Sequence, residues 1–285
     1  MSRNKERLGG VQKPDTGPPP AAMQQTQAEG FSFVVPTEFV ELPSGGKYYA
    51  EDHPLHNAES IEIRQMTAKE EDLLTSRTLI KKGVALDRVI KNIIVDRRIN
   101  PDTLLTGDRN AIIIATRITG YGHIYETKVS CPNCAAQQQY SFDLTEATVY
   151  DGADPDEDDQ VNDHGDGTFT TTLPRIKLPV TFRLLTGKDE RSLMAGMETD
   201  RKRKNEQSIT RQLRNMIVAV DGQNAPQVID YLVDHLPSMD SRQLRMCYRL
   251  AAPNVDLTQH FECAECDFAQ DMEVPLTADF FWPDR

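Results

Sequence analysis

Two Cys-x-x-Cys pairs set the strongest constraint on how this chain folds. Cys131 and Cys134 form one pair, and Cys263 and Cys266 form the other, 132 residues further on. Each pair lies between stretches of alternating apolar residues, which is typical of the tight end of a β-hairpin. A structural zinc ion takes four ligands, so neither pair can saturate it alone. We therefore expect the two hairpins to form one zinc ribbon, with a single structural Zn2+ per chain bound by all four cysteines.

Other interpretations of the cysteine pairs stay open at this point. A redox-active Cys-x-x-Cys usually opens a helix in a thioredoxin-like βαβ unit, and neither pair has that context. Metal-free thiol pairs and a zinc ion bridged between two subunits are further alternatives. The fifth cysteine, Cys247, lies on the apolar face of a predicted helix, where we expect a small buried side chain.

The segments that precede the two cysteine pairs also resemble each other. "IEIRQMTAKEEDLL" (61–74) matches "VTFRLLTGKDERSL" (180–193) at an offset of 119, and "RVIKNIIV" (88–95) matches "RQLRNMIV" (211–218) at an offset of 123. A third set matches at the offset of the cysteines, 132: Leu104, Asp108, Ile112, Arg117 and Ile118 against Leu236, Asp240, Leu244, Arg249 and Leu250. Matches that keep one order and nearly one offset predict an internal duplication.

Each predicted copy consists of a strand, three helices and a β-hairpin that carries its cysteine pair. Strands and helices that do not alternate as βαβ units favour an α+β fold. The expected organisation is a flexible arm at 1–30, a β-hairpin lead-in at 31–60, copy one at 61–146, an acidic loop with connecting strands at 147–179, copy two at 180–278 and an aromatic tail at 279–285.

Local signals place several elements more closely. "FSFVVPTEFVELPSGGKYY" (31–49) alternates apolar residues around a Ser-Gly-Gly turn, which predicts a β-hairpin. Thr67, followed three residues later by Glu70, forms a capping box that predicts the start of a helix. In the second copy we expect a buried helical stripe formed by Leu193, Met197, Ile209, Leu213 and Met216.

Composition limits the classes of partner. Residues 1–30 are rich in Pro, Gly and Gln, so we expect them to stay flexible or to become ordered on a partner. The formal net charge is −12, and the segment 151–166 supplies eight acidic residues and no Lys or Arg. Nucleic-acid-binding proteins normally show a basic face, and none is visible. No apolar run reaches the roughly 18 residues of a membrane span, so we expect neither nucleic acid nor membrane as a partner.

No group of residues in the sequence indicates catalysis. None of the six histidines pairs convincingly with a nucleophile. The sequence also lacks a Gly-rich phosphate loop and a nucleophile elbow. We therefore expect a protein that is not an enzyme.

Aromatic residues gather at two places that could contact other proteins. The C-terminal segment "DFFWP" contains Phe280, Phe281 and Trp282, and the turn "PSGGKYY" contains Tyr48 and Tyr49. Aromatic side chains are good interface anchors, which makes these five residues our interface candidates. The alternative for both places is that they fold back onto the protein's own core.

Several segments together resemble a known phage family. They are "ELPSGGKYY" (41–49), "IEIRQMTAKEEDLLTS" (61–76), "LLTGDRNAIIIATRITGYGHIYETKVSCPNC" (104–134) and "DFFWP" (279–283). They look like the baseplate hub or hub-assembly proteins of T-even-type contractile-tailed bacteriophages. The resemblance covers residues 38–146 well and the second copy more loosely, whereas the arm and the acidic segment 151–166 lie outside it.

This resemblance implies a structural or assembly role at the tail baseplate, without enzymatic activity. We expect other phage baseplate and tail proteins as partners, a virion location after assembly in the host cytoplasm, and compatibility with a homo-oligomer within the baseplate. One rival function is a cytosolic hub-assembly chaperone that is not retained in the virion. A rival from another class is a zinc-ribbon nucleic-acid-binding regulator, but "CPNCAAQQQ" and "CAECDFAQD" carry no Lys or Arg.

Overall fold

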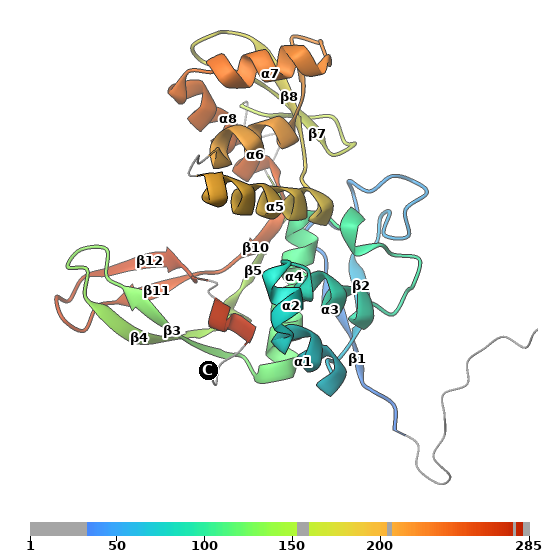
Figure 1. Cartoon of the computed structure of the whole chain (residues 1–285), viewed down its shortest axis with the longest axis vertical. Helices are drawn as coiled ribbons and strands as arrows, with labels where there is room; N and C mark the ends of the chain where they lie inside the picture. The colour runs from blue at the N-terminus through green and yellow to red at the C-terminus, as the bar shows by residue number, and fades with distance from the viewer. Residues whose placement is uncertain (1–32, 153–159, 204–206, 276–277, 282–285) are drawn as a thin grey trace, which may run out of the picture. The chain divides into compact units, whose positions relative to one another are not determined.

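The computed structural model describes residues 33–152, 160–203, 207–275 and 278–281. The predicted flexible arm at 1–30 and Trp282 lie outside these described residues. The chain divides into two compact units, Met1–Val35 and Pro36–Arg285. All helices and strands given below belong to the second unit, which mixes helices and strands as the predicted α+β class requires (Figure 1).

The first half of this unit begins with two antiparallel strands and ends with a β-hairpin. Strand β1 (Thr37–Glu41) pairs with β2 (Ser60–Arg64), and β3 (Ile124–Ser130) pairs with β4 (Gln137–Asp143). Between the pairs lie α1 (Ala68–Thr75), α2 (Arg77–Lys81), α3 (Ala85–Ile93), η1 (Pro101–Thr103) and α4 (Thr106–Tyr121), and η2 (Leu144–Glu146) and β5 (Thr148–Tyr150) follow the hairpin.

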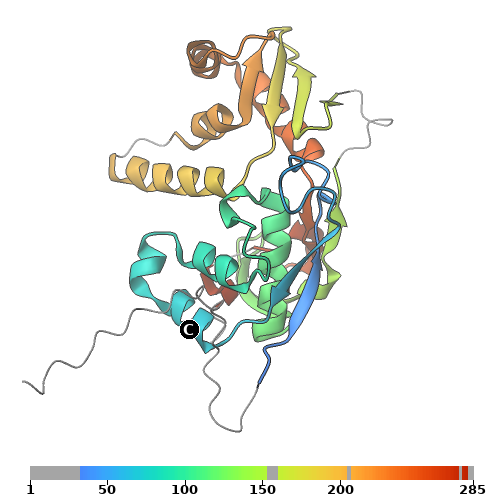
Figure 2. The same cartoon turned by 90° about the vertical axis from the view of Figure 1, so that its right-hand side faces the viewer.

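The second half has a similar order of elements with a larger sheet. Strands β6 (Asn162–Asp163), β7 (Thr168–Thr172), β8 (Pro179–Arg183) and β9 (Ile217–Val220) form an antiparallel sheet in that order. Its helices are α5 (Gly187–Arg203), α6 (Ser208–Met216), α7 (Pro226–His235) and α8 (Ser238–Ala251), and Figure 2 shows α5 and α6 as separate helices. After them come β10 (Asn254–Asp256), the hairpin β11 (Thr258–Glu262) and β12 (Ala269–Glu273), and η3 (Ala278–Phe281). Strand β10 pairs with β5 of the first half.

The capping box at the start of α1 is confirmed. The Glu70 carboxylate accepts hydrogen bonds from the Thr67 amide (3.0 Å) and hydroxyl (2.7 Å), which caps the helix. Arg64 donates to both oxygens of the same carboxylate, at 3.0 and 2.7 Å. The arrangement recurs 119 residues later before α5, where Arg183, Thr186 and Asp189 take the same roles.

This ion pair predicts an acid-sensitive contribution to stability. Burial raises the pKa of Glu70, but hydrogen bonds from Arg64 and Thr67 lower it more, so the pKa falls from 4.5 to about 2. Because the folded-state pKa lies below the unfolded one, the stabilisation is complete above pH 4.5 and is lost as the pH falls through about 2. We expect Glu70→Gln to cost roughly 1–3 kcal/mol of unfolding free energy at neutral pH and much less near the folded-state pKa. Urea unfolding of both proteins at the two pH values tests this, and an equal loss at both would contradict it.

The structure differs from the β-hairpin expected at 31–49. Strand β1 pairs with β2 instead, and the segment between them forms a long turn. The buried carboxylate of Asp108, at the start of α4, accepts hydrogen bonds from the Ser44 amide (2.9 Å), the Ser44 hydroxyl (2.6 Å) and the Tyr49 hydroxyl (2.7 Å). These three bonds hold the turn over α4, so Lys47–Tyr49 does not continue as a strand beside β1.

The apolar stripe expected in the second copy is only partly buried. Leu213 and Met216 of α6 are buried, and Leu193 of α5 is half-buried. Met197 and Ile209 remain 55% and 46% exposed. The stripe belongs to two helices, α5 and α6, so the 3.6-residue period does not continue from one to the other.

Candidate metal centre

Each cysteine pair lies in the tight turn of its hairpin, and both turns have the same hydrogen bonds. The Cys131 amide donates to the Ala136 carbonyl (2.8 Å), and the Ala135 amide donates to the Cys131 carbonyl (2.9 Å). In the second hairpin, Cys263 bonds Phe268 at 2.9 Å and Asp267 bonds Cys263 at 3.2 Å in the same way. Ala135 and Asp267 both have positive φ, 58° and 52°, which turns each chain back so that its two sulfurs converge.

The two turns bring all four cysteine sulfurs together. The Sγ atoms of Cys131, Cys134, Cys263 and Cys266 all lie within 4.8 Å of one another. Two of the cross-hairpin pairs, Cys131 with Cys266 and Cys134 with Cys263, are both 3.8 Å apart. Four sulfurs bound tetrahedrally at about 2.3 Å from an ion are about 3.8 Å apart, whereas disulfide sulfurs are about 2.05 Å apart. The cluster could therefore hold a metal ion, with two ligands from each half of the chain.

Burial and polarity differ among the four thiols. Cys131 and Cys263 are buried, Cys266 is half-buried and Cys134 is exposed. The pKa of Cys131 is lowered to about 7, first by the backbone N–H of Cys134 and also by that of Asn133. The pKa of Cys134 is raised to about 12: the N–H of Ala136 lowers it, but hydrogen bonds with the neighbouring thiols, Cys266 first, raise it more. Four close thiols cannot all ionise without a counter-charge, so a bound cation would displace their protons.

Side chains on β4 and β11 hold the hairpins against each other. The Gln138 amide donates to the Glu262 carbonyl and accepts from the Ala264 amide, both at 2.9 Å, and so fixes the second cysteine turn. Gln259 reciprocates by bonding both the carbonyl and the amide of Asp143. Neither glutamine was among the residues predicted from the sequence, although the run "QQQ" beside the first cysteine pair is a polar signal on an otherwise ordinary strand.

The structure places four of the five interface candidates within the protein's own packing. Tyr48 is half-buried, and its hydroxyl donates to Asp163 at 2.9 Å. Tyr49, Phe280 and Phe281 are buried, and the Phe280 ring meets the Tyr125 ring edge-on with centroids 5.2 Å apart. Contact between any of these residues and a partner stays a prediction.

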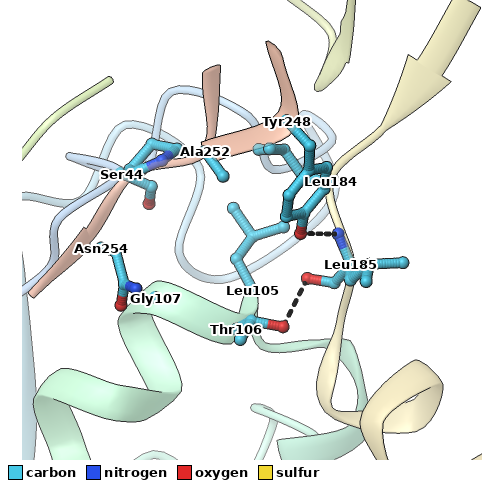
Figure 3. A pocket seen from close by; sticks show the side chains of 10 residues that line it. Ser44, Leu105, Thr106, Gly107, Leu184, Leu185, Tyr248, Ala252 and Asn254 are labelled. Atoms are coloured by element: carbon cyan, nitrogen blue, oxygen red, sulfur yellow. Dashed lines mark hydrogen bonds between the residues drawn. The ribbon is translucent and has the colours of Figure 1, made fainter. Parts of the chain in front are cut away.

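A small cavity lies where the two halves meet, at the start of α4 (Figure 3). The Leu185 carbonyl accepts from the Thr106 hydroxyl (3.1 Å), and the Leu185 amide donates to the Tyr248 hydroxyl (3.2 Å). The cavity measures about 50 Å3, whereas pockets for small molecules measure about 300–1,000 Å3. Its size and its role as a junction make it a poor substrate site.

Comparison with known protein families gives a match for the first half of the chain. Residues 35–168 match the family model described as T4 bacteriophage base plate protein. This segment of the chain is therefore similar to the T4-like phage baseplate proteins. The match runs from two residues before β1 to the first residue of β7, so it includes Cys131 and Cys134 but not the second cysteine pair.

This match supports a structural role at the phage baseplate, with other tail proteins as partners. No curated protein and no solved structure matches the chain significantly. Among the described residues, no helix is both long enough and apolar enough to cross a membrane.

Proposed function

We propose that the chain is an internally duplicated structural subunit in the hub region of a contractile-tail baseplate, stapled by one zinc ion and without catalytic activity. The observation that carries the proposal is a four-cysteine cluster built from two hairpins that lie 132 residues apart, in a chain whose first half is similar to the baseplate proteins. A metal site closed by four protein ligands has no open position for a substrate, which favours a structural ion.

Three recurrences support the duplication. The first is the Arg–carboxylate–Thr arrangement before α1 and α5, and the second is the pair of identical cysteine turns. In the third, the segment after each hairpin contacts the opposite half: the Tyr150 hydroxyl donates to the Leu250 carbonyl (2.6 Å), and Arg117 Nε donates to the Phe280 carbonyl (2.5 Å). Two copies that exchange contacts in this way are mutually dependent, and the metal joins them at a further point.

Zinc is the ion that fits this ligand set best. Four thiolates in a tetrahedral arrangement select zinc or an iron–sulfur centre over hard cations such as magnesium or calcium. The tight spacing of the sulfurs, at most 4.8 Å, suits a single ion and leaves no room for the inorganic sulfides of a cluster. Zinc has no redox chemistry, so its contribution would be to fix the two halves relative to each other for assembly.

Mass spectrometry of purified phage tails tests the structural role. We expect the protein in intact tails at a fixed ratio to the sheath protein. Absence from tails, together with abundance in infected cells, would instead support the hub-assembly chaperone. The nucleic-acid-binding alternative has no support from the cysteine turns, which carry no Lys or Arg, and a lack of gel shift with phage DNA and RNA at low salt would eliminate it.

A further inference from the structure

The outer edge of β1 offers unpaired backbone groups. In the antiparallel pair with β2, the Leu42 amide bonds the Glu59 carbonyl and the Gln65 amide bonds the Pro36 carbonyl. Alternation along an antiparallel pair then turns the N–H and C=O groups of Thr37, Phe39 and Glu41 away from β2. Within the described residues these groups form no backbone hydrogen bond, and the β1–β2 sheet has no third strand.

The equivalent edge in the second half is covered. Strand β7 pairs with β8 as β1 pairs with β2, so Thr168 opposite Arg183 corresponds to Thr37 opposite Arg64. The outer edge of β7 is occupied by β6: Asn162 pairs with Thr170, and the His164 amide donates to the Thr168 carbonyl at 3.1 Å. The same edge of the same element is therefore closed by a short antiparallel strand in one half and open in the other.

The open edge also has a defined chemistry. Phe39 is 73% exposed in the middle of β1, between Glu38 and Glu41, and Glu62 lies opposite it on β2. Strand β1 carries no Lys or Arg. Arg64, on the neighbouring strand, is bound to Glu70 and so does not neutralise the edge. Protected edges usually carry lysine, proline or a covering element, and this edge has an exposed aromatic ring and acidic groups instead.

We propose that the outer edge of β1 binds an extended, basic segment of another tail protein as an added antiparallel strand, in the position that β6 occupies on β7. Backbone hydrogen bonds to Thr37, Phe39 and Glu41 would supply affinity, an apolar side chain would cover Phe39, and Lys or Arg would lie opposite Glu41, on the sheet face to which Glu62 also adds a negative charge. A second copy of the chain fits less well, because it would bring two acidic strands together in a protein of net charge −12. The assignment of the partner to the phage tail rests on the proposed function. The evidence that the edge of β1 is open does not rest on it.

A peptide-binding measurement on the full-length chain tests the proposal. The probes are overlapping 12-residue peptides that cover the other tail proteins of the same phage, measured by fluorescence anisotropy. We expect binding by peptides that combine Lys or Arg with a β-branched or aromatic residue, and weaker binding as salt rises. Phe39→Pro should weaken it at least about tenfold, because the ring replaces an outward N–H and blocks the edge but leaves the bonds to β2 in place.

The matched control is Phe39→Thr, which removes the aromatic ring, keeps the N–H and copies Thr170 of the second half. It should bind more tightly than Phe39→Pro. If Phe39→Pro does not fold, Thr37→Pro removes another outward N–H at the first position of the strand, where proline is tolerated. The proposal fails if no basic peptide binds, if the proline variants bind as well as wild type, or if the edge is taken by self-association that the proline variants abolish. Absence of the chain from purified tails would refute the baseplate role and leave the peptide result standing.

Discussion

Replacing Cys134 with serine is expected to reduce bound zinc from one ion per chain to well under half, and to lower the free energy of unfolding by several kcal/mol. Cys134 is exposed, so the substitution removes a ligand without opening a hole in the core. Because its sulfur lies 3.8 Å from that of Cys263, loss of the ligand should release both hairpins. Elemental analysis of the purified chain and urea unfolding measure the two effects.

A comparison across the two halves shows whether the site is shared. Cys263→Ser should release the metal as completely as Cys134→Ser, although the two residues lie 129 positions apart. The double variant should lower the free energy of unfolding little more than either single variant does, because each single substitution already removes the same ion. Additive losses, or one metal retained after either change, would contradict a shared site.

Cys247→Ala is the matched control for both cysteine variants. Cys247 is buried outside the four-cysteine cluster, and its position corresponds to Ala115 in the first half, so alanine already occupies the equivalent place. We expect one zinc per chain and a loss of stability limited to about 1–2 kcal/mol from the small cavity. Loss of the metal in this variant would show that the cysteine effects are not specific to the cluster.

Features with local causes were predictable from the sequence. The meeting of the two cysteine pairs was predictable too, because each pair is an incomplete ligand set that the other completes, but other features that depend on distant contacts were not. The capping box spans the four residues from Thr67 to Glu70, and each Cys-x-x-Cys motif also spans four residues. The local sequence pattern was therefore enough to predict each of them. The partner of β1 was missed because it depends on Asp108, 64 residues after Ser44, which draws the intervening turn away. Nothing in the local alternation around Ser44 carries information on that carboxylate.

The repeat pattern also did not predict burial, because residues at equivalent positions of the two copies can have different neighbours. Arg117 and Arg249 correspond in sequence, yet Arg117 is 1% exposed and Arg249 is exposed. The difference arises from the C-terminal segment: η3 packs on α4 and places the Phe280 carbonyl on Arg117, and among the described residues no such segment bonds Arg249. The two arginines therefore differ only in the tertiary contact that the C-terminal segment makes with Arg117, which their sequence positions do not reveal.

The Arg117 guanidinium has three backbone acceptors and no carboxylate partner among the described residues. It donates to the carbonyls of Phe280 (2.5 Å), Gly122 (2.5 Å) and Ile124 (3.2 Å). Burial lowers its pKa, so the interior position is costly and is offset by these bonds. The side chain therefore joins the end of α4, the start of β3 and the C-terminal segment.

We expect Arg117→Ala to lower the free energy of unfolding by roughly 3–5 kcal/mol, because the buried Phe280 carbonyl and two part-buried carbonyls lose their donor and a cavity opens beside Phe280. Arg117→Lys should recover part of this loss, since an ammonium group can reach fewer of the three acceptors. Arg249→Ala, the matched change in the second half, should cost less than about 0.5 kcal/mol, because an exposed side chain leaves no buried group unpaired. Urea unfolding of the three variants measures these differences, and limited proteolysis should release the C-terminal segment first in Arg117→Ala. Similar losses from Arg117→Ala and Arg249→Ala would mean that this contact does not hold the C-terminal segment to the first half.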